Sequence, residues 1–293
     1  MDKGRYDRQE LLFGQEGQAK LEALTVAIVG LGGLGSHVAQ QLAYLGVKSY
    51  VLVDKDIATK TNLNRLIGAT EAHVERQALK VDIAWNMIQS ILPEATVATV
   101  ANSFITYEAF MALETADVVF GCVDHDGARL ILNEFCQAYG KPYFDLATDI
   151  NPEDLTFGGR VLYADGRVCV SCKQLLDEHA LRAAFSTDAQ LEEEKRIYGI
   201  RRGAVGETGP AVVSLNGILA SVAVTEFLVD VTGIRSAYLH LEYKGMMGIL
   251  ARDSTSPNFD CYYCKAVRGQ GSAADVEHYI REGWADRWIP DKL

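Results

Sequence analysis

The sequence lacks an excess of basic residues, and it lacks a long uninterrupted apolar run. Its 293 residues include 39 acidic and 28 basic side chains, which gives a formal net charge of −11. This balance argues against binding of nucleic acid, which requires clustered Lys and Arg. The longest gently apolar stretch, residues 211–231, contains Ser, Asn, Thr and Glu, so it is a poor membrane span and favours a buried or subunit-facing helix. The sequence therefore predicts neither a nucleic-acid nor a membrane partner.

The N-terminus lacks the features of an export signal. Residues 1–10, MDKGRYDRQE, are charged and have no apolar core, so we expect a cytoplasmic protein. Internal repeats and low-complexity segments are also missing from the sequence. Apolar residues make up 48% of the chain, which is enough to bury one large core or two modest ones.

A glycine-rich turn is the first positive signal. Residues 26–54 read as strand, turn, helix and strand, and the turn GLGGLG contains the spacing G-x-G-x-x-G. Such a turn lets the backbone approach phosphate oxygens at a helix N-terminus. Asp54 lies 24 residues after Gly30, close to the separation expected of an acid that hydrogen-bonds a ribose hydroxyl. These features favour a nucleotide site over a turn that serves packing alone. Its candidate residues are Gly30, Gly32, Gly33, Gly35 and Asp54.

Apolar strand-like runs and helical segments alternate through the first half of the chain. The expected strands cover residues 26–29, 50–53, 95–101, 117–124 and 142–148. One long helix is expected to begin in the polar segment after Asp54 and to continue to residue 92. This alternation predicts an α/β fold with a Rossmann-like, doubly wound, mostly parallel sheet. We expect this nucleotide-binding half at residues 26–150, after an N-terminal helical arm at residues 1–25.

The second half has a different pattern. Residues 154–172 read as antiparallel hairpins, with ADGR as a turn, and more strands are expected within residues 237–251. The charged stretch at residues 177–202 is interpreted as a solvated helical face and a mobile loop rather than a catalytic segment. We therefore expect antiparallel strands to continue the sheet within residues 151–268, before a C-terminal tail at residues 269–293.

Four of the six cysteines form two C-x-x-C pairs, and each pair is half of a tetrahedral zinc site. The pairs are 88 residues apart, so they must meet through the fold. A disulfide is disfavoured in the cytosol, and CVSC follows a strand-like run rather than the helix start typical of redox motifs. A structural zinc site is favoured over two independent reduced pairs, whereas Cys122 and Cys136 are interpreted as core residues. The expected zinc ligands are Cys169, Cys172, Cys261 and Cys264.

Charged and polar residues follow the glycine turn too densely for a typical nicotinamide site. Two cations and two or three acids near a nucleotide suit a triphosphate and Mg²⁺. Each residue alone could be an exposed charge or a helix cap, but their joint arrangement favours ATP over NAD. The residues concerned are Asp56, Asn62, Asn64, Arg65, Lys80 and Asp124.

An ordered set of motifs resembles the ThiF/MoeB/HesA family of ubiquitin-activating-type adenylyltransferases. The set comprises RYDRQ, GLGGLG, DKD, NLNR, a lysine fifteen residues later, CVD followed by Arg129, and the paired C-x-x-C motifs. The resemblance extends from about Arg5 to Lys265. It implies a homodimer that uses MgATP to adenylate the C-terminal carboxylate of a ubiquitin-like or sulfur-carrier protein ending in glycine.

The resemblance also implies a role for each matching residue. The segment from Gly30 to Gly35 would bind phosphate, and Asp54 would bind the ribose. Arg8 would be a cation delivered to the site of the partner subunit. The chain departs from the usual pattern at Leu66, where many relatives have glutamine, and at His125, where they often have asparagine. The implied phosphate contacts are Asn62, Arg65 and Lys80, the implied magnesium ligand is Asp124, and the implied zinc ligands are the four paired cysteines.

The expected chemistry needs few groups. A C-terminal carboxylate is ionised at pH 7, so its attack on the α-phosphate requires no general base. In relatives that form a thioester or persulfide, a cysteine lies in the crossover segment, but residues 181–210 contain none here, so we expect the reaction to end at the acyl-adenylate. Alternatives are adenylation of a short peptide or small carboxylate, a non-catalytic nucleotide-binding subunit and, remotely, an NAD oxidoreductase. Retention of Arg65, Lys80 and Asp124 argues against a non-catalytic subunit.

Overall fold

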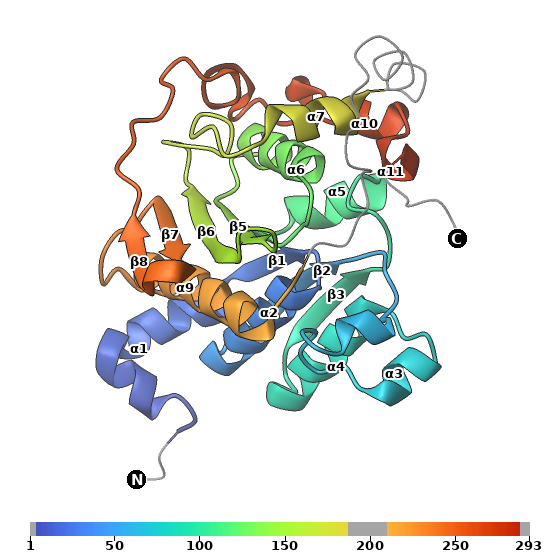
Figure 1. The fold of residues 1–293 in the computed structure, drawn as a ribbon. Helices are drawn as coiled ribbons and strands as arrows, with labels where there is room; N and C mark the ends of the chain where they lie inside the picture. Colours follow the sequence, from blue (N-terminus) through green and yellow to red (C-terminus); the bar gives the residue numbers. More distant parts are fainter. Residues whose placement is uncertain (1–3, 187–209, 288–293) are drawn as a thin grey trace.

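The computed structural model describes residues 4–186 and 210–287, which share one eight-stranded sheet of order β3-β2-β1-β4-β5-β6-β7-β8 (Figure 1). β1 to β5 are mutually parallel, and the remaining strands continue the sheet in antiparallel fashion. The strands are β1 (Thr25–Val29), β2 (Ser49–Val53), β3 (Thr96–Val100), β4 (Val118–Gly121), β5 (Tyr143–Asn151), β6 (Thr156–Ala164), β7 (His240–Lys244) and β8 (Ile249–Arg252). The predicted mixed sheet, parallel first and antiparallel afterwards, is confirmed.

Helices cover both faces of the sheet (Figure 1). One face is packed against α1 (Asp7–Ala23), α2 (Gly33–Leu45), α4 (Lys80–Ile91) and α9 (Val213–Thr232). The other face is packed against α5 (Tyr107–Glu114), α6 (Asp126–Ala138) and the short C-terminal helices α10 (His278–Arg281) and α11 (Trp284–Arg287). Further helices are α3 (Glu71–Glu75), α7 (Glu178–Phe185), η1 (Lys60–Asn62), η2 (Gly245–Met247), η3 (Tyr263–Val267) and η4 (Gly271–Ala274).

The central strands are apolar along their whole length because both of their faces are buried. In β1, Val26 and Ile28 pack on the α2 and α9 side, whereas Ala27 and Val29 pack on the α5 and α6 side. Successive side chains of a strand point to opposite faces, so a strand between two helical layers needs apolar residues at every position. This is why the short apolar runs of the sequence located these strands to within a few residues.

α9 confirms the prediction of a buried helix, because it lies along α2 and the sheet. Its Phe227 ring packs edge-on against Phe120, with ring centroids 5.6 Å apart. Among the described residues, α9 is the one helix long and apolar enough to cross a membrane by length and composition, and 50% of that window is buried. A core helix passes the same test, so the packing of α9 accounts for its apolar composition.

Two local predictions were wrong. The helix expected to run continuously to residue 92 is divided into α3 and α4, because Gln77 adopts a left-handed φ of 51° and Leu79 is extended. There, Leu79 forms a bridge with Ile57, and the Ala58 N–H donates to the carbonyl of Ala78. These contacts leave Lys80 as the first residue of α4, beside the end of β2.

The second error concerns the strand expected after the turn ADGR. β6 ends at Ala164 and pairs with β5 and β7, but residues 168–172 form a turn instead of returning as a strand. Val168 and Val170 are buried beneath α6, which explains why the segment reads as an apolar strand. The charged stretch expected at residues 177–202 begins with α7, and most of the remainder lies outside the described residues.

Candidate functional site

The predicted phosphate turn joins β1 to α2 and is held by close backbone approaches. Gly30 has a left-handed φ of 88°, and a Cβ on it would lie 2.6 Å from the carbonyl oxygen of Cys122. A Cβ on Gly35 would lie 1.9 Å from the carbonyl oxygen of Gly30. Neither position can hold a side chain in this conformation. Gly32 precedes the first residue of α2, whose free N–H groups therefore lie at the carboxyl end of the parallel strands.

Asp54 follows β2 and fixes the glycine turn. Its Oδ2 accepts a hydrogen bond from the Leu31 N–H at 2.6 Å, and its Oδ1 accepts one from the Asp56 N–H at 2.8 Å. Burial raises the pKa of the Asp54 carboxyl, and the positive charge of Lys80 opposes this effect. The acid expected to bind ribose thus also holds the phosphate turn in place.

Lys80 brings a positive charge to the same edge of the sheet. Its Nζ lies 2.6 Å from Asp56 Oδ2, and its side chain is only 12% exposed, against 51% for Asp56. Burial would lower the pKa of Lys80, but the charges of Asp54 and Asp56 outweigh burial and raise it. Asp124 adds to this effect from the end of β4. Lys80 is therefore a cation held among carboxylates.

The NLNR segment lies against the first turn of α2. The Ile67 N–H donates to Ser36 Oγ at 3.0 Å, and the Arg65 Cδ lies 3.4 Å from the place where a Gly33 Cβ would stand. The guanidinium of Arg65 donates to the Thr61 carbonyl oxygen at 2.6 Å. The structure therefore brings Arg65 to the phosphate turn, with its charged end bonded to its own loop.

Two other residues of this region have local structural roles. Asn62 Oδ1 accepts a hydrogen bond from the Thr59 N–H at 3.0 Å, so the amide closes the η1 turn. Leu66, which replaces the glutamine of many relatives, is 5% exposed and packs with Ala58 and Ile83 in a small apolar cluster. The departure at Leu66 therefore serves packing.

Asp124 and His125 lie between β4 and α6. Asp124 is exposed, and within residues 4–186 and 210–287 its carboxylate has no hydrogen bond. His125 Nδ1 accepts a hydrogen bond from the Ala128 N–H at 3.1 Å and so caps α6. Burial lowers the pKa of His125. The free oxygen ligands of Asp124 fit a divalent cation, whereas His125 is occupied by the helix.

A buried ion pair supports the Asp124 loop from below. Arg129 donates to Val123 O at 2.6 Å, to Leu146 O at 2.8 Å and to Asp145 Oδ1 at 2.7 Å. Tyr143 also donates to Asp145 Oδ1, at 2.9 Å. The resemblance included Arg129 without giving it a function, and Asp145 was missed. The one available signal was a charged residue inside the apolar strand PYFDLAT.

Arg8 does not lie at the phosphate turn of its own chain. The Gln9 side chain donates to the Leu45 carbonyl oxygen at 3.0 Å, and the Tyr6 ring lies against Gly46. Both contacts are at the C-terminal end of α2. A helix of 13 residues is roughly 20 Å long, so α2 separates Arg8 from the turn at its other end.

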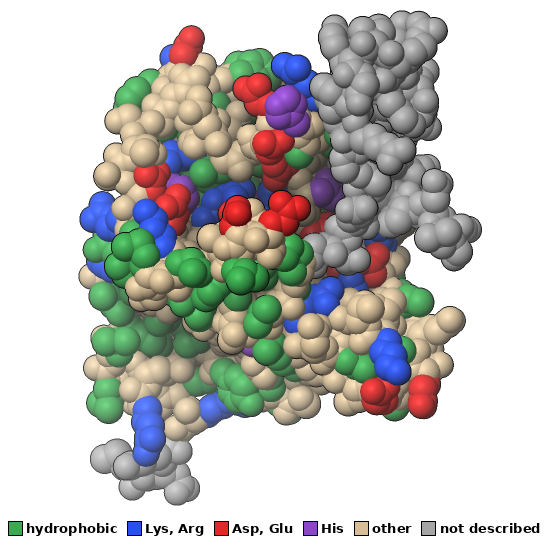
Figure 2. All heavy atoms as spheres, viewed as in Figure 1, with side chains coloured by type: hydrophobic (Ala, Val, Ile, Leu, Met, Phe, Trp, Pro, Cys, Tyr) green, Lys and Arg blue, Asp and Glu red, His purple; other side chains and the backbone are tan. Residues whose placement is uncertain are grey.

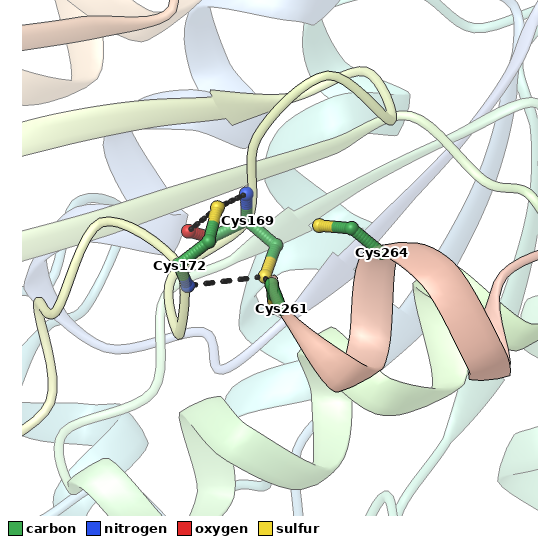
Figure 3. A group of neighbouring side chains, drawn as sticks. All are labelled: Cys169, Cys172, Cys261 and Cys264. Carbon is green, nitrogen blue, oxygen red and sulfur yellow. Dashed lines mark hydrogen bonds between the residues drawn. The ribbon is translucent and has the colours of Figure 1, made fainter. Parts of the chain in front are cut away.

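The four paired cysteines meet beneath α6, as predicted (Figure 3). Cys169 and Cys172 come from the segment after β6, Cys261 lies just before η3, and Cys264 lies within η3 (Figure 3). All four sulfur atoms lie within 4.8 Å of one another, and the Sγ atoms of Cys169 and Cys261 are 3.7 Å apart. Four thiolates around one zinc ion would be separated by roughly 3.8 Å, given a Zn–S distance of about 2.3 Å. The arrangement fits one tetrahedral ion.

The thiols of the cluster and the two other cysteines lie in different environments. Within the cluster, hydrogen bonds with Cys169 and Cys264 lower the pKa of Cys172, whereas hydrogen bonds with Cys172 and Cys264 raise the pKa of Cys169. Cys122 and Cys136, in contrast, lie in the two apolar cores, and burial raises the pKa of each. Both are core residues, as expected.

The chain belongs to the ThiF family, whose model matches residues 6–265, so the resemblance drawn from the motifs is confirmed. One relative is the adenylyltransferase and sulfurtransferase MOCS3 of Drosophila grimshawi, which is 36% identical over 143 residues, or 48% of this chain and 31% of the relative. Another is the sulfur carrier protein ThiS adenylyltransferase of Bacillus subtilis, 31% identical over 142 residues, or 48% of this chain and 42% of the relative. The matched region is less than half the length of either relative.

Solved structures share the fold at lower identity. Escherichia coli MccB with ATP has a TM-score of 0.67 and 18% identity, and the match covers 90% of this chain and 75% of that one. PaaA has a TM-score of 0.62 and 19% identity, and the match covers 87% and 82% of the two chains. At these identities the likeness shows the fold alone.

Replacing Asp145 with Asn should strongly destabilise the protein, because Arg129 would keep its charge in the core and lose its closest counterion, leaving Asp126 at 3.8 Å. We expect the free energy of unfolding to fall by about 3 to 5 kcal/mol in a denaturant titration. Asp260→Asn is the control, because it removes the partner of Lys265 from an exposed ion pair and should leave stability unchanged. Equal denaturation midpoints for the two variants would contradict the supporting role of the buried pair.

Proposed function

We propose that this protein is an adenylyltransferase that uses MgATP to activate the C-terminal carboxylate of a ubiquitin-like or sulfur-carrier protein ending in glycine. The observation that carries the proposal is the convergence of the glycine turn, Arg65, Lys80 and the acids Asp54 and Asp56 at the start of α2. Membership of the ThiF family and the names of the sequence relatives support it.

A short peptide or a small carboxylate is the second candidate substrate. The fold is shared with MccB, a microcin C7 biosynthetic enzyme whose structure was solved in complex with N-formylated MccA. Both candidate substrates present a carboxylate to the same phosphate, so the chemistry at the nucleotide would be the same. The surface that binds the rest of the substrate would differ.

Electrostatics explain why magnesium belongs in the proposal. The negative charges of Asp54, Asp56 and Asp124 all raise the pKa of Lys80, and Asp56 is in direct contact with it, so acids act on this lysine before a triphosphate enters. A bound Mg²⁺ would supply the missing positive charge and polarise the phosphoryl oxygens. The carboxylate of Asp124, which is exposed and has no hydrogen bond in the described part of the chain, is the group we assign to hold it, alongside the phosphates.

The proposed reaction is an in-line displacement. A carboxylate oxygen of the partner attacks the α-phosphorus of ATP, the bond to the bridging oxygen breaks, and pyrophosphate leaves with the electron pair. The N–H groups at the start of α2 would orient the phosphates, Asp54 would hold the ribose, and Arg65 and Lys80 would offset the charge of the transition state. Arg65 would exchange its bond to Thr61 for one to phosphate.

The acyl-adenylate is the proposed end product. Cys122 and Cys136 are buried core residues, and the other four cysteines form the cluster beneath α6. Residues 187–209 lie outside the described residues, but their sequence contains no cysteine. A separate protein or small nucleophile would therefore take the activated acyl group.

Replacing Asp124 with Asn should reduce ATP–pyrophosphate exchange at least about a hundredfold, because it removes a magnesium ligand without changing side-chain volume. The assay would contain wild-type protein, MgATP, labelled pyrophosphate and each candidate carboxylate in turn. Glu108→Gln, on the exposed face of α5, is the control and should exchange normally.

Two results would contradict the assignment. Undiminished exchange by Asp124→Asn would exclude its role. A wild-type protein that binds MgATP but exchanges pyrophosphate with no candidate carboxylate would support a non-catalytic nucleotide-binding subunit instead.

We also propose one structural zinc ion per chain at the cysteine cluster. Elemental analysis should find it in freshly purified protein, and acidification should release it because all four ligands must be deprotonated. Cys264→Ser should lower the zinc content and the melting temperature, whereas Cys136→Ala, from the same apolar core, should keep its zinc. Freely titratable thiols in metal-free protein would refute the proposal.

A homodimer is the proposed assembly. Exposed apolar side chains gather over α1, the start of α9 and the η2–β8 region (Figure 2). Such a contiguous patch is typical of a subunit interface. A two-fold dimer through this surface would let α1 of one subunit approach the other subunit, and Arg8 cannot reach its own phosphate turn. The patch residues include Leu11, Leu12, Val213, Ile218, Met246, Met247, Ile249 and Leu250.

Mixing Arg8→Ala chains with Asp124→Asn chains should restore activity, although each variant alone is expected to be inactive. In the mixed dimer, one site would combine an intact Asp124 with the partner's intact Arg8. Statistical mixing should recover about a quarter of wild-type exchange, because half of the dimers are mixed and each has one complete site. Mixed dimers that form, as shown by two affinity tags, but stay inactive would mean that Arg8 does not act across the interface.

A further inference from the structure

Asn216 is an almost completely buried residue whose side-chain amide has no hydrogen-bond partner among the described residues. It lies in the first turns of α9 and is 3% exposed. Its backbone N–H donates to the Val212 carbonyl oxygen, but its side chain forms no hydrogen bond with any residue in the described part of the chain. Buried amides are normally paired, because losing water without gaining a partner is unfavourable. The Asn216 amide is not one of the fully buried side-chain groups that lack a partner, so it keeps a contact with solvent, and a ligand can take the place of water there.

The Asn216 amide lies over the first residue of the phosphate-binding helix. Its Nδ2 lies 2.1 Å from the place where a Cβ on Gly33 would stand, and its Cγ lies 2.9 Å from the same place. The Arg65 Cδ approaches this place to 3.4 Å from another side. Gly33 is a glycine that the G-x-G-x-x-G spacing does not require. The amide explains it, because any side chain there would displace Asn216.

Contacts on both sides hold Asn216 in this position. Asn64, next to Arg65, donates from its side chain to the Ala211 carbonyl oxygen at 3.4 Å, just before α9 begins. Further along α9, Gln41 of α2 donates to Ser221 Oγ at 3.1 Å. The start of α9 is therefore fixed between the NLNR segment and α2, and the amide cannot swing far from the turn.

We propose that Asn216 is a further phosphate ligand, which rests on the proposed function. Its Nδ2 donates a hydrogen bond to a phosphate oxygen of ATP held at the N-terminus of α2. The free N–H groups of α2 attract the anion, and the amide adds a fixed donor without adding charge. The second half of the chain thereby contributes directly to the nucleotide site, from a residue that no nucleotide-binding motif includes.

The test compares MgATP with adenosine, which lacks phosphate, in calorimetric titrations of the full chain. Asn216→Leu keeps a similar shape but cannot donate, so its Kd for MgATP should rise about tenfold, as expected for losing a hydrogen bond to a charged group. Asn216→Asp should weaken MgATP further, because it places a negative charge at the phosphates. Adenosine should bind both variants as it binds wild-type protein.

Ser221→Ala is the matched control, because it removes an α2–α9 hydrogen bond from the same helix away from the turn. Its Kd for MgATP should stay within about twofold of wild type. Should Asn216→Leu fail to fold, Asn216→Asp carries the test alone. MgATP binding and pyrophosphate exchange by the wild-type protein test the proposed function. The ratio of each variant's Kd for MgATP to the wild-type Kd tests the role of Asn216.

Three results would overturn the role of Asn216. Unchanged MgATP binding in both variants would exclude a phosphate contact. A parallel loss of MgATP and adenosine binding would make the amide a packing residue. An unchanged Kd for MgATP with a raised KM for the carboxylate partner would move its contact to that partner.

Discussion

The whole candidate site depends on how closely the start of α2 is approached by its surroundings. The backbone of Gly30 reaches the chain after β4, the helix at Gly35 passes over Gly30, and the side chain of Asn216 covers Gly33. In each case, the neighbouring atoms occupy the space that a Cβ would fill. Three sterically demanding contacts within six residues explain why the turn holds so many glycines, and why strands β1 and β4 can present their carboxyl ends together.

Charge organises the layer next to this turn. Asp54, Asp56 and Asp124 all act on Lys80 where the parallel strands end, and these carboxylates alone would repel a nucleotide. The repulsion is limited because several acids are already paired within the protein. Asp54 accepts hydrogen bonds from backbone N–H groups, Asp56 pairs with Lys80, and Asp145 pairs with Arg129. Asp124 is exposed and, within the described residues, its carboxylate has no hydrogen bond. Among these acids, internal pairing therefore separates groups that shape the site from the group that can accept a ligand.

The sequence predicted what depends on local pattern or on the chemistry of a few atoms. Apolar runs located the strands, and the preference of zinc for four thiolates predicted that distant cysteine pairs would meet. Errors arose where tertiary contacts override the sequence pattern. Gln77 interrupts a helical stretch because the residues after it form β-bridge contacts. The segment that holds the first cysteine pair is apolar because it is buried, so it resembles a strand. Asp145 and Asn216 were missed for a related reason, since the residues that they approach, Arg129 and Gly33, lie on other elements far away in the sequence.

The meeting of the cysteine pairs has a consequence for the integrity of the chain. Residues 173–260 include α9, β7 and β8, and the two cysteine pairs that flank this segment meet at one point. Within the segment, β7 pairs with β6, which precedes it in the chain. A cross-link closing a loop of this length restricts the unfolded chain by roughly 4 to 5 kcal/mol. With zinc bound at the cluster, a single backbone cut between the two cysteine pairs would leave both fragments joined through the four cysteines. Asn216 would then still lie against α2.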